Sequence, residues 1–182
     1  MRSLSQIKGN ILKLLWDIES PVNLREISEK TGLENRSANM HLLGLKRAGY
    51  VSALEGGRYT ITELGREILG FPKVDENMAR RVLTKTSMDR AFHFYTGIGQ
   101  RLEVHSDNLV DFCDKIKTVD IESVEFHATR GDFELWVHFL GDIELAKRLR
   151  LLREADLTGE TLRERLCKTL KSRCDELLGK IA

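Results

Sequence analysis

The sequence contains few of the residues that mark specialised protein classes. Its three cysteines, Cys113, Cys167 and Cys174, include no C-x-x-C pair, which argues against a zinc ribbon or a thioredoxin motif. A sparse, odd set of this kind is typical of cysteines that pack as small hydrophobic side chains. No apolar run approaches the ~20 residues that span a bilayer, and the N-terminal MRSLSQIKGN lacks the apolar core of a signal peptide. We therefore expect a cytoplasmic protein that does not associate with membranes.

An excess of charge of one sign is also lacking. The net charge is +1, and 41% hydrophobic with 31% charged residues describes a globular chain. Residues 1–72 hold ten Lys/Arg and eight Asp/Glu, whereas residues 101–140 hold four and nine. The acidic stretch argues against a nucleic-acid surface there, while the first seventy residues are compatible with one.

Motifs for catalysis, metals and nucleotides are missing as well. There is no H-E-x-x-H, no G-x-S-x-G and no P-loop, and the G-I-G of residues 97–99 lacks the third glycine of a dinucleotide loop. The candidate histidines and carboxylates of the second half lack the spacing of metal ligands. We expect no enzyme activity, no metal and no cofactor; a ligand pocket under Trp136 and Phe94 is the more plausible alternative. The candidates considered are His93, His105, His127, His138, Asp120, Glu122, Glu125, Asp132 and Glu134.

The first seventy residues carry the clearest pattern. Apolar residues at helical spacing precede Pro21, and Asn23 with Glu26 three residues later predicts a capped second helix that ends at Thr31-Gly32. A third helix is predicted over about 34–48, ended by Gly49. The segments 50–54 and 58–62, joined by E-G-G, are typical of a hairpin, and T-E-L-G-R-E-I-L of a last helix.

This order resembles the winged helix-turn-helix of bacterial and archaeal transcription regulators. The resemblance covers about Leu4 to Phe71 and depends on the T-G-L turn, the A-G-Y-V exit toward the hairpin and the third helix, with Ser37, Ala38, His41, Leu42 and Leu45 in family-like places. It implies a fold in which the third helix enters the major groove of duplex DNA and the hairpin forms the wing.

Asn and Arg side chains read base edges in the major groove, whereas Lys and Arg elsewhere contact phosphate. The resemblance therefore implies base contacts near the start of the third helix, phosphate contacts late in it and a backbone contact from the wing. Leu43 and Gly44 depart from the pattern, because many relatives carry exposed charges there. We expect Gly44 to mark a close backbone approach and Leu43 to be an exposed contact. The expected DNA-binding residues are Asn35, Arg36, Ser37, Asn39, Met40, Lys46, Arg47 and Arg58.

The second half predicts further helices and one short hairpin. Residues 72–90 predict a connecting helix or linker, and A-F-H-F-Y-T-G-I-G-Q-R-L-E-V-H-S an extended pair around a glycine turn. An amphipathic helix follows from Ser106. Between residues 119 and 152, the alternation of apolar and polar residues also fits strands. The helical spacing of the apolar residues nevertheless favours helices that begin at Asp120, Asp132 and Asp142. A last helix is predicted over about 159–181.

This half resembles an uncharacterised, mostly archaeal family. The shared pattern is F-x-F-Y-x-G-x-G, then S-x-E-F-H-x-x-R-G-D-F-E-x-W, then L-G-D-x-x-L-A, read here from Phe92, Ser123 and Leu140 onward. The family's activity is unknown to us, so it implies a fold and no chemistry. The combination with the winged helix is similar to an archaeal transcription regulator, with a weaker resemblance to the archaellum regulators of euryarchaea.

The sequence therefore predicts a mainly α fold with small β elements. We expect a DNA-binding domain at 1–71, a connecting segment at 72–90, and a helix-rich domain at 91–182 for dimerisation, partner binding or sensing. The expected partners are double-stranded DNA, a second copy of the chain and a protein of the transcription machinery. The alternative is a winged helix that binds another protein through Leu43 and does not bind DNA specifically. The sequence gives no operator, direction of regulation or effector.

Overall fold

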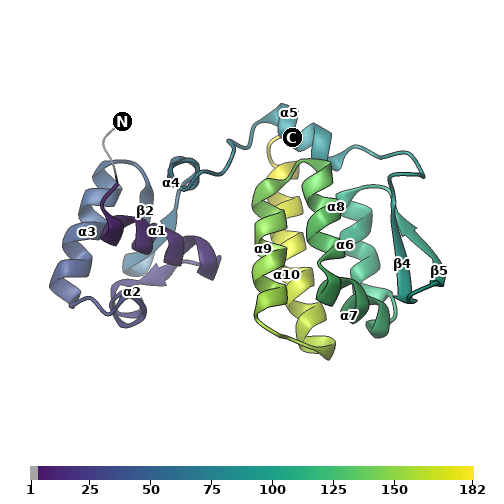
Figure 1. Cartoon of the computed structure of the whole chain (residues 1–182). Coiled ribbons are helices and arrows are strands. Elements are labelled where there is room, and N and C mark those ends of the chain that lie inside the picture. Colours follow the sequence, from purple (N-terminus) through teal and green to yellow (C-terminus); the bar gives the residue numbers. More distant parts are fainter. Residues whose placement is uncertain (1–3) are drawn as a thin grey trace. The chain divides into compact units, whose positions relative to one another are not determined.

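A computed structural model describes residues 4–182 of the chain (Figure 1). The chain divides into two compact units, Met1–Lys73 and Val74–Ala182. Both are mainly helical with a small sheet, as the sequence predicted. The expected range 1–71 begins with residues 1–3, which lie outside the described residues. In residues 4–182, no helix is both long enough and apolar enough to cross a membrane.

The first unit packs its helices against a small antiparallel sheet. The strand order in residues 4–73 is β1-β3-β2, with Val22 opposite Tyr59 and Val51 opposite Ile61. Apolar side chains from α1, β1, α2, α3 and β2 fill the core between them: Ile11, Leu12, Leu15, Val22, Ile27, Leu42, Leu45 and Val51. The elements are α1 (Gln6–Ile18), β1 (Val22–Asn23), α2 (Leu24–Thr31), α3 (Asn35–Arg47), β2 (Val51–Leu54), the 3₁₀ turn η1 (Glu55–Gly57), β3 (Arg58–Ile61) and α4 (Glu63–Ile68).

Local signals in the sequence account for the boundaries of α2 and α3. The Asn23 side chain accepts from the Glu26 N–H at 2.9 Å, and the Glu26 carboxylate accepts from the Asn23 N–H at 3.0 Å, so the predicted capping box is confirmed. Gly32 and Gly49 follow the two helices with φ of +70° and +78°, which glycine adopts without steric cost. The two-residue strand β1 was not predicted, because two residues are too few to show an alternating pattern.

Two glycines of the first unit, Gly65 and Gly44, differ in the atoms that lie closest to them. A Cβ on Gly65 of α4 would lie 2.2 Å from the backbone oxygen of Tyr50 and 2.7 Å from Cγ1 of Ile61, so only glycine fits this contact. A Cβ on Gly44 would meet only the flexible Lys8 side chain, 3.2 Å from Nζ. The close neighbour expected at Gly44 is therefore a side chain, and the expectation of a backbone approach was wrong.

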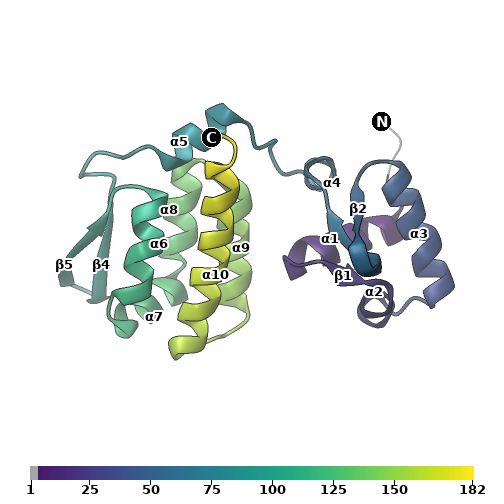
Figure 2. The same cartoon turned by 180° about the vertical axis from the view of Figure 1, so that it is seen from behind.

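In the second unit, one long helix is the centre of the packing. Helix α10 contacts α5, α6, α7 and α9, and Figure 2 shows it with α6 on one side and α9 on the other. The hairpin β4-β5 packs on α6 and α7, at the edge of the helices (Figure 1). The elements are α5 (Glu76–Leu83), β4 (Phe92–Gly97), β5 (Gln100–Ser106), α6 (Leu109–Thr118), α7 (Ile121–Arg130), α8 (Asp132–Leu140), α9 (Ile143–Glu154) and α10 (Gly159–Leu178).

The segment 72–90 belongs largely to this second core. Helix α5 lies where a connecting helix was expected, but Met78, Ala79 and Val82 are buried with the apolar residues of the second unit. Val74, at the start of the unit, is buried there too. Residues 74–90 are therefore part of the second unit and not a linker between two domains.

The segment between 119 and 154 forms helices, as apolar spacing favoured, and not strands. Asp120 and Asp142 are N-caps as predicted, and Asp142 accepts from the Leu145 N–H at 3.0 Å. The expected cap at Asp132 was wrong. Gly131, with φ +76°, ends α7 and itself precedes α8, so Asp132 is already helical and its carboxylate is available for other contacts.

A buried ion-pair network joins α9 to α10. Arg173 is 4% exposed, and its guanidinium donates to both oxygens of Asp142, at 2.7 Å and 2.9 Å. The same group lies 3.4 Å from Glu144 and 2.5 Å from Glu176. Burial alone would lower the pKa of Arg173, but the hydrogen bonds and charge of Asp142, with the neighbouring carboxylates, raise it above its ordinary value. The arginine therefore stays charged inside the core.

His127 ties the hairpin to the start of α8. Its Nε2 accepts from the Tyr95 N–H at 2.8 Å, so the ring proton is on Nδ1, which donates to Asp132 at 2.8 Å. Asp132 also accepts from Arg130 Nε at 3.0 Å. Burial lowers the pKa of His127 below 6.5, although Asp132 acts in the opposite direction. The imidazole is neutral in the folded chain and acts as a structural bridge.

The two glycine contacts predict opposite effects of the same substitution. Gly65→Ala should destabilise the first unit by about 1–3 kcal/mol, since the backbone of Tyr50 cannot move away without disturbing the sheet. Gly44→Ala should be neutral or stabilise by up to ~1 kcal/mol, since Lys8 can change rotamer and alanine is the better helix former. Urea unfolding followed by circular dichroism measures both; equal destabilisation would contradict the assigned contacts.

The neutral His127 predicts a loss of stability in acid. Its pKa is lower in the folded chain than the ordinary 6.5 of an unfolded one, so protonation favours unfolding. The contribution is fully present above about pH 6.5 and is lost as the pH falls below that value. In the Trp16→Phe variant, Trp136 of the second unit is the remaining tryptophan, so its fluorescence reports the unfolding of that unit. The free energy of unfolding measured in this way should fall as the pH is lowered below about 6.5. This dependence of the unfolding free energy on pH should become weaker when His127→Gln is added. An unchanged dependence would assign it to other groups.

Candidate functional site

The outer face of α3 carries most of the predicted site residues. Arg36, Met40, Leu43 and Arg47 follow one another at three- and four-residue intervals, so they form one exposed stripe along the helix. Met40 is 62% exposed and Leu43 is 41% exposed, which confirms the expected exposure of Leu43. Asn35 and Lys46 are also exposed, and Ser37 and Asn39 are half-buried beside the stripe.

The predicted residues fall into three places on the first unit. Asn35, Arg36, Ser37, Asn39 and Met40 are together in the first half of α3. Lys46 and Arg47 are in its last turn, about 15 Å along the axis from the first group at 1.5 Å per residue. Arg58 begins β3, directly after the glycines of the hairpin turn and opposite Leu54.

The polar groups on this face have no partners among the residues that the structure describes. Within residues 4–182, the side chains of the candidate residues make no hydrogen bond and no ion pair, so their donors and acceptors are available to a ligand. Elsewhere in the same unit the charges are occupied: Glu26 closes the capping box of α2, and Arg25 pairs with Glu29 at 2.9 Å. The residues whose side chains lack such a partner in the described part of the chain are Asn35, Arg36, Ser37, Asn39, Lys46, Arg47 and Arg58.

One further cation, Lys8 of α1, was missed by the sequence reasoning. Its ammonium group lies beside Gly44 of α3, 3.2 Å from where a Cβ would be. Lys8 therefore adds a positive charge at the middle of the helix, between the two predicted groups. The glycine in mid-helix was a visible signal of a close neighbour, but spacing along the chain does not identify a residue from another helix.

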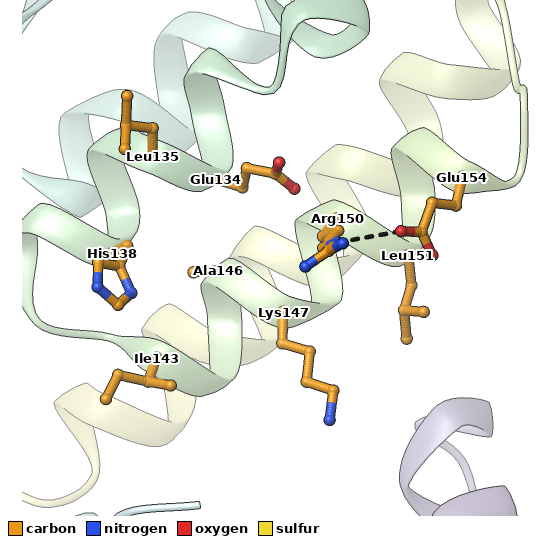
Figure 3. A pocket seen from close by; sticks show the side chains of 9 residues that line it. All are labelled: Glu134, Leu135, His138, Ile143, Ala146, Lys147, Arg150, Leu151 and Glu154. Atoms are coloured by element: carbon orange, nitrogen blue, oxygen red, sulfur yellow. Dashed lines mark hydrogen bonds and ion pairs between the residues drawn. The ribbon is translucent and has the colours of Figure 1, made fainter.

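A second feature is an apolar groove between α8 and α9, with a volume of about 570 Å³ (Figure 3). Leu135 and His138 line it from α8, while Ile143, Ala146 and Leu151 line it from α9. Large apolar side chains are unusually exposed on this face: Leu135 is 69% and Ile143 is 45% exposed. Phe139, also on α8, is 54% exposed and lies under the Arg90 guanidinium.

Charges of both signs surround this groove. Arg150 pairs with Glu154 at 3.0 Å, a contact that Figure 3 marks, and Glu134 pairs with Arg153 at 2.9 Å. Lys147 points away from the α9 backbone beside them (Figure 3). The groove therefore combines an apolar floor with a rim of mixed charge, which is typical of a surface for protein association.

A third feature is a pocket of about 530 Å³ beside the turn of β4-β5. It brings together two of the segments by which the second half resembles a known family, the hairpin and the end of α7 with the start of α8. The expected pocket under Trp136 and Phe94 was partly wrong: Trp136 lines it, but Phe94 is fully buried against Phe112. The lining residues are Ala91, Phe92, His93, Tyr95, Gly97, Ile98, Gly99, Phe126, His127, Arg130, Asp132 and Trp136.

The histidines and cysteines of the second unit have structural surroundings. His93 and His105 are neighbours with ring centroids 5.9 Å apart, but within residues 4–182 the histidines, cysteines and carboxylates form no group suited to a metal. Cys113 and Cys174 are buried on α6 and α10, the Cys174 thiol lies 3.8 Å from the Leu109 backbone oxygen, and the neighbouring Cys174 lowers the pKa of Cys113. All three cysteines are free thiols.

Comparisons with known proteins identify a family without a described activity. Neither the curated proteins nor the solved structures include a match to this chain. The sequence profile of a family of unknown function, DUF5752, matches residues 39–171, which is 133 of the 182 residues. The match begins within α3 and extends into α10, so it includes parts of both units. The chain is therefore a member of the DUF5752 family.

Proposed function

We propose that the first unit is a winged helix-turn-helix and that the protein is a sequence-specific DNA-binding transcription regulator of the cytoplasm, without enzymatic activity. Helices α2 and α3, joined by a short turn and followed by the β2-β3 hairpin, have the order of that fold. The observation that carries the proposal is the exposed face of α3, whose polar and cationic side chains have no partners within residues 4–182.

The positions of these side chains match the chemistry of duplex DNA. Helix α3 has 13 residues, about 20 Å, and the major groove admits one such helix. Arg36 offers two donors to guanine, and Asn35 and Asn39 each offer a donor and an acceptor to adenine. Met40, exposed among them, suits the methyl group of thymine. These residues would read the sequence.

Phosphate contacts would come from cations on several elements. Lys46 and Arg47 are exposed in the last turn of α3, Lys8 reaches its middle, and Arg58 follows the hairpin turn. Phosphate contacts from the middle and the end of a helix and from the wing fix the register of the helix in the groove without reading bases. The small excess of positive charge in residues 1–72 limits non-specific binding, so the base contacts must supply much of the selectivity.

We further propose that the apolar face of α8 and α9 pairs with the same face of a second copy. Leu135 projects beside a hollow lined by Ile143, Ala146 and Leu151. The projecting side chain and the hollow that would receive Leu135 of the second copy therefore lie on one face, as a two-fold interface requires. The mixed charges of the rim favour self-pairing over a partner of one charge. Exposed apolar patches are often functional surfaces, and a stable pair of copies would bury roughly 800 Å² on each.

A second candidate function has its own observation. Met40 and Leu43 are exposed apolar residues on the same stripe of α3, so this helix also suits the surface of another protein, including one of the transcription machinery. Under that alternative the winged helix would bind no duplex specifically. Selection of bound duplexes from a random library with the full chain separates the two functions before any mutation is made.

Single substitutions on α3 should separate base reading from phosphate contact. Arg36→Ala should weaken binding to the selected duplex by roughly 5- to 150-fold and relax specificity at one position. Lys46→Ala should weaken binding to all duplexes alike and reduce the salt slope by about one. Fluorescence anisotropy at two salt concentrations measures both.

The matched control for these variants is Arg165→Ala, which removes an exposed arginine from the second unit and should leave DNA affinity unchanged. If the unmutated chain enriches no motif, the protein-binding alternative is the better description. If Arg36→Ala and Lys46→Ala have the same uniform effect on every duplex, α3 contacts phosphate only.

A charge at position 135, on the apolar face of α8 and α9, should separate the two copies. Leu135→Glu would place a carboxylate against the apolar floor of the partner's groove, which costs several kcal/mol when unpaired. Sedimentation analysis of the unmutated chain should give twice the 20.8 kDa chain mass, and that of Leu135→Glu a single chain mass. Met88→Glu, at another exposed apolar site, is the control. A monomeric unmutated chain would refute the interface without touching the DNA proposal.

A further inference from the structure

We propose that the pocket beside the β4-β5 turn binds a small, uncharged planar ring that carries an N–H donor next to a carbonyl acceptor, the edge found in cyclic amides. The pocket belongs to the second unit alone, so this inference does not depend on DNA binding by the first. Its volume of about 530 Å³ is within the ~300–1,000 Å³ of small-molecule sites.

Most polar groups in the pocket wall are already occupied by the protein. Both nitrogens of His127 are used, one by the Tyr95 N–H and one by Asp132. His93 contacts the Met88 carbonyl at 3.1 Å and Arg101 at 2.9 Å. The indole N–H of Trp136 donates to a backbone oxygen at 3.0 Å. These hydrogen bonds hold the side chains of the pocket wall in place, so the groups that make them are not available to a ligand.

The remaining polar groups have complementary character. Asp132 uses Oδ2 for both of its contacts, which leaves Oδ1 as an acceptor. Arg130 uses Nε, which leaves its two terminal nitrogens as donors. The Tyr95 hydroxyl has no partner within residues 4–182. A ligand that matches this set must donate to Asp132 and accept from Arg130 at neighbouring atoms.

The charges around the pocket select an uncharged ligand. A cation would meet the guanidinium group of Arg130, which lines the pocket and lies 5.0 Å from the centroid of the Phe126 ring. An anion would meet Asp132 and, in the adjoining hollow, Glu122 and Glu125. Residues 101–140 also carry five more acidic than basic groups. A neutral molecule avoids both costs.

The apolar part of the wall favours a flat ring. Phe92, Phe126 and Trp136 present aromatic surface to the pocket, and aromatic rings pack well against planar molecules. At the turn, Ile98 is 90% exposed, although an isoleucine gains by burial. The next residue, Gly99, has φ +76°. Because Ile98 lines the pocket mouth, a ring bound there would bury apolar surface of this side chain.

Hypoxanthine is a suitable probe, because its N1–H is next to a carbonyl oxygen. In the full chain with Trp16→Phe, Trp136 is the remaining tryptophan, and its emission should change saturably as hypoxanthine is added. Binding of 1-methylhypoxanthine, which lacks the donor, should be roughly tenfold weaker because Asp132 then loses its hydrogen bond. Ligand-observed saturation-transfer NMR checks both affinities independently of absorbance.

Variants test whether binding occurs at this pocket. Tyr95→Phe removes a hydroxyl but keeps the backbone N–H that binds His127, and Ile98→Ser changes an exposed turn residue, so both should fold. Each should weaken hypoxanthine binding severalfold, whereas Ile143→Ser in the α8-α9 groove should not. Arg130→Ala should weaken it most, with the melting temperature measured to confirm folding.

Three outcomes would overturn the proposal. The first is stronger binding of benzoate or choline than of hypoxanthine, which would assign the pocket to a charged ligand. The second is equal affinity for the methylated probe, which would remove the role of Asp132. The third is no binding of hypoxanthine at millimolar concentration to a folded chain. Severalfold weaker binding in Ile98→Ser but not in Ile143→Ser, with discrimination against the methylated probe, supports it.

Discussion

The second unit depends on the buried contact between Arg173 and Asp142. Removing both charges from water costs several kcal/mol per ion, so the pair is tolerated only because the guanidinium meets both carboxylate oxygens. Asp142 has a second role, since it caps α9. The position where α8 ends and α9 begins is therefore fixed against α10 by charge as well as by packing. Helix α9, which forms one wall of the α8-α9 groove, is therefore held in place against α10 by this contact.

Much of this architecture is visible in the sequence because it depends on local chemistry. The capping box of Asn23 and Glu26, the cap at Asp142 and the glycines after helices act within four residues, so their spacing is enough to predict them. Apolar spacing likewise distinguished α8 from a strand. The predicted residues of α3 share one exposed region for the same reason, since a helix places residues three and four apart on one face.

The features that escaped prediction depend on distant partners. Asp132 has the sequence context of an N-cap, but it contacts His127 and Arg130 because Gly131 takes the capping position. Lys8 reaches α3 from another helix, and α5 joins a core whose other members are up to a hundred residues away. In each case the local sequence pattern is present, but contacts with residues of other elements decide the structure. The spacing of residues along one element does not reveal those contacts.

The family match gives a reason to consider the two units together. It extends across the boundary at Lys73, so the family includes the last part of the first unit as well as most of the second. If the first unit binds DNA and two copies pair through α8 and α9, the second copy of that unit is held near the DNA as soon as the first has bound, and affinity rises through effective concentration without a new contact. A ligand beside the hairpin would alter this only by binding the paired and unpaired forms with different affinities. Regulation of DNA binding by the pocket would therefore require that its shape, set by His127 and Asp132, differs between those two forms.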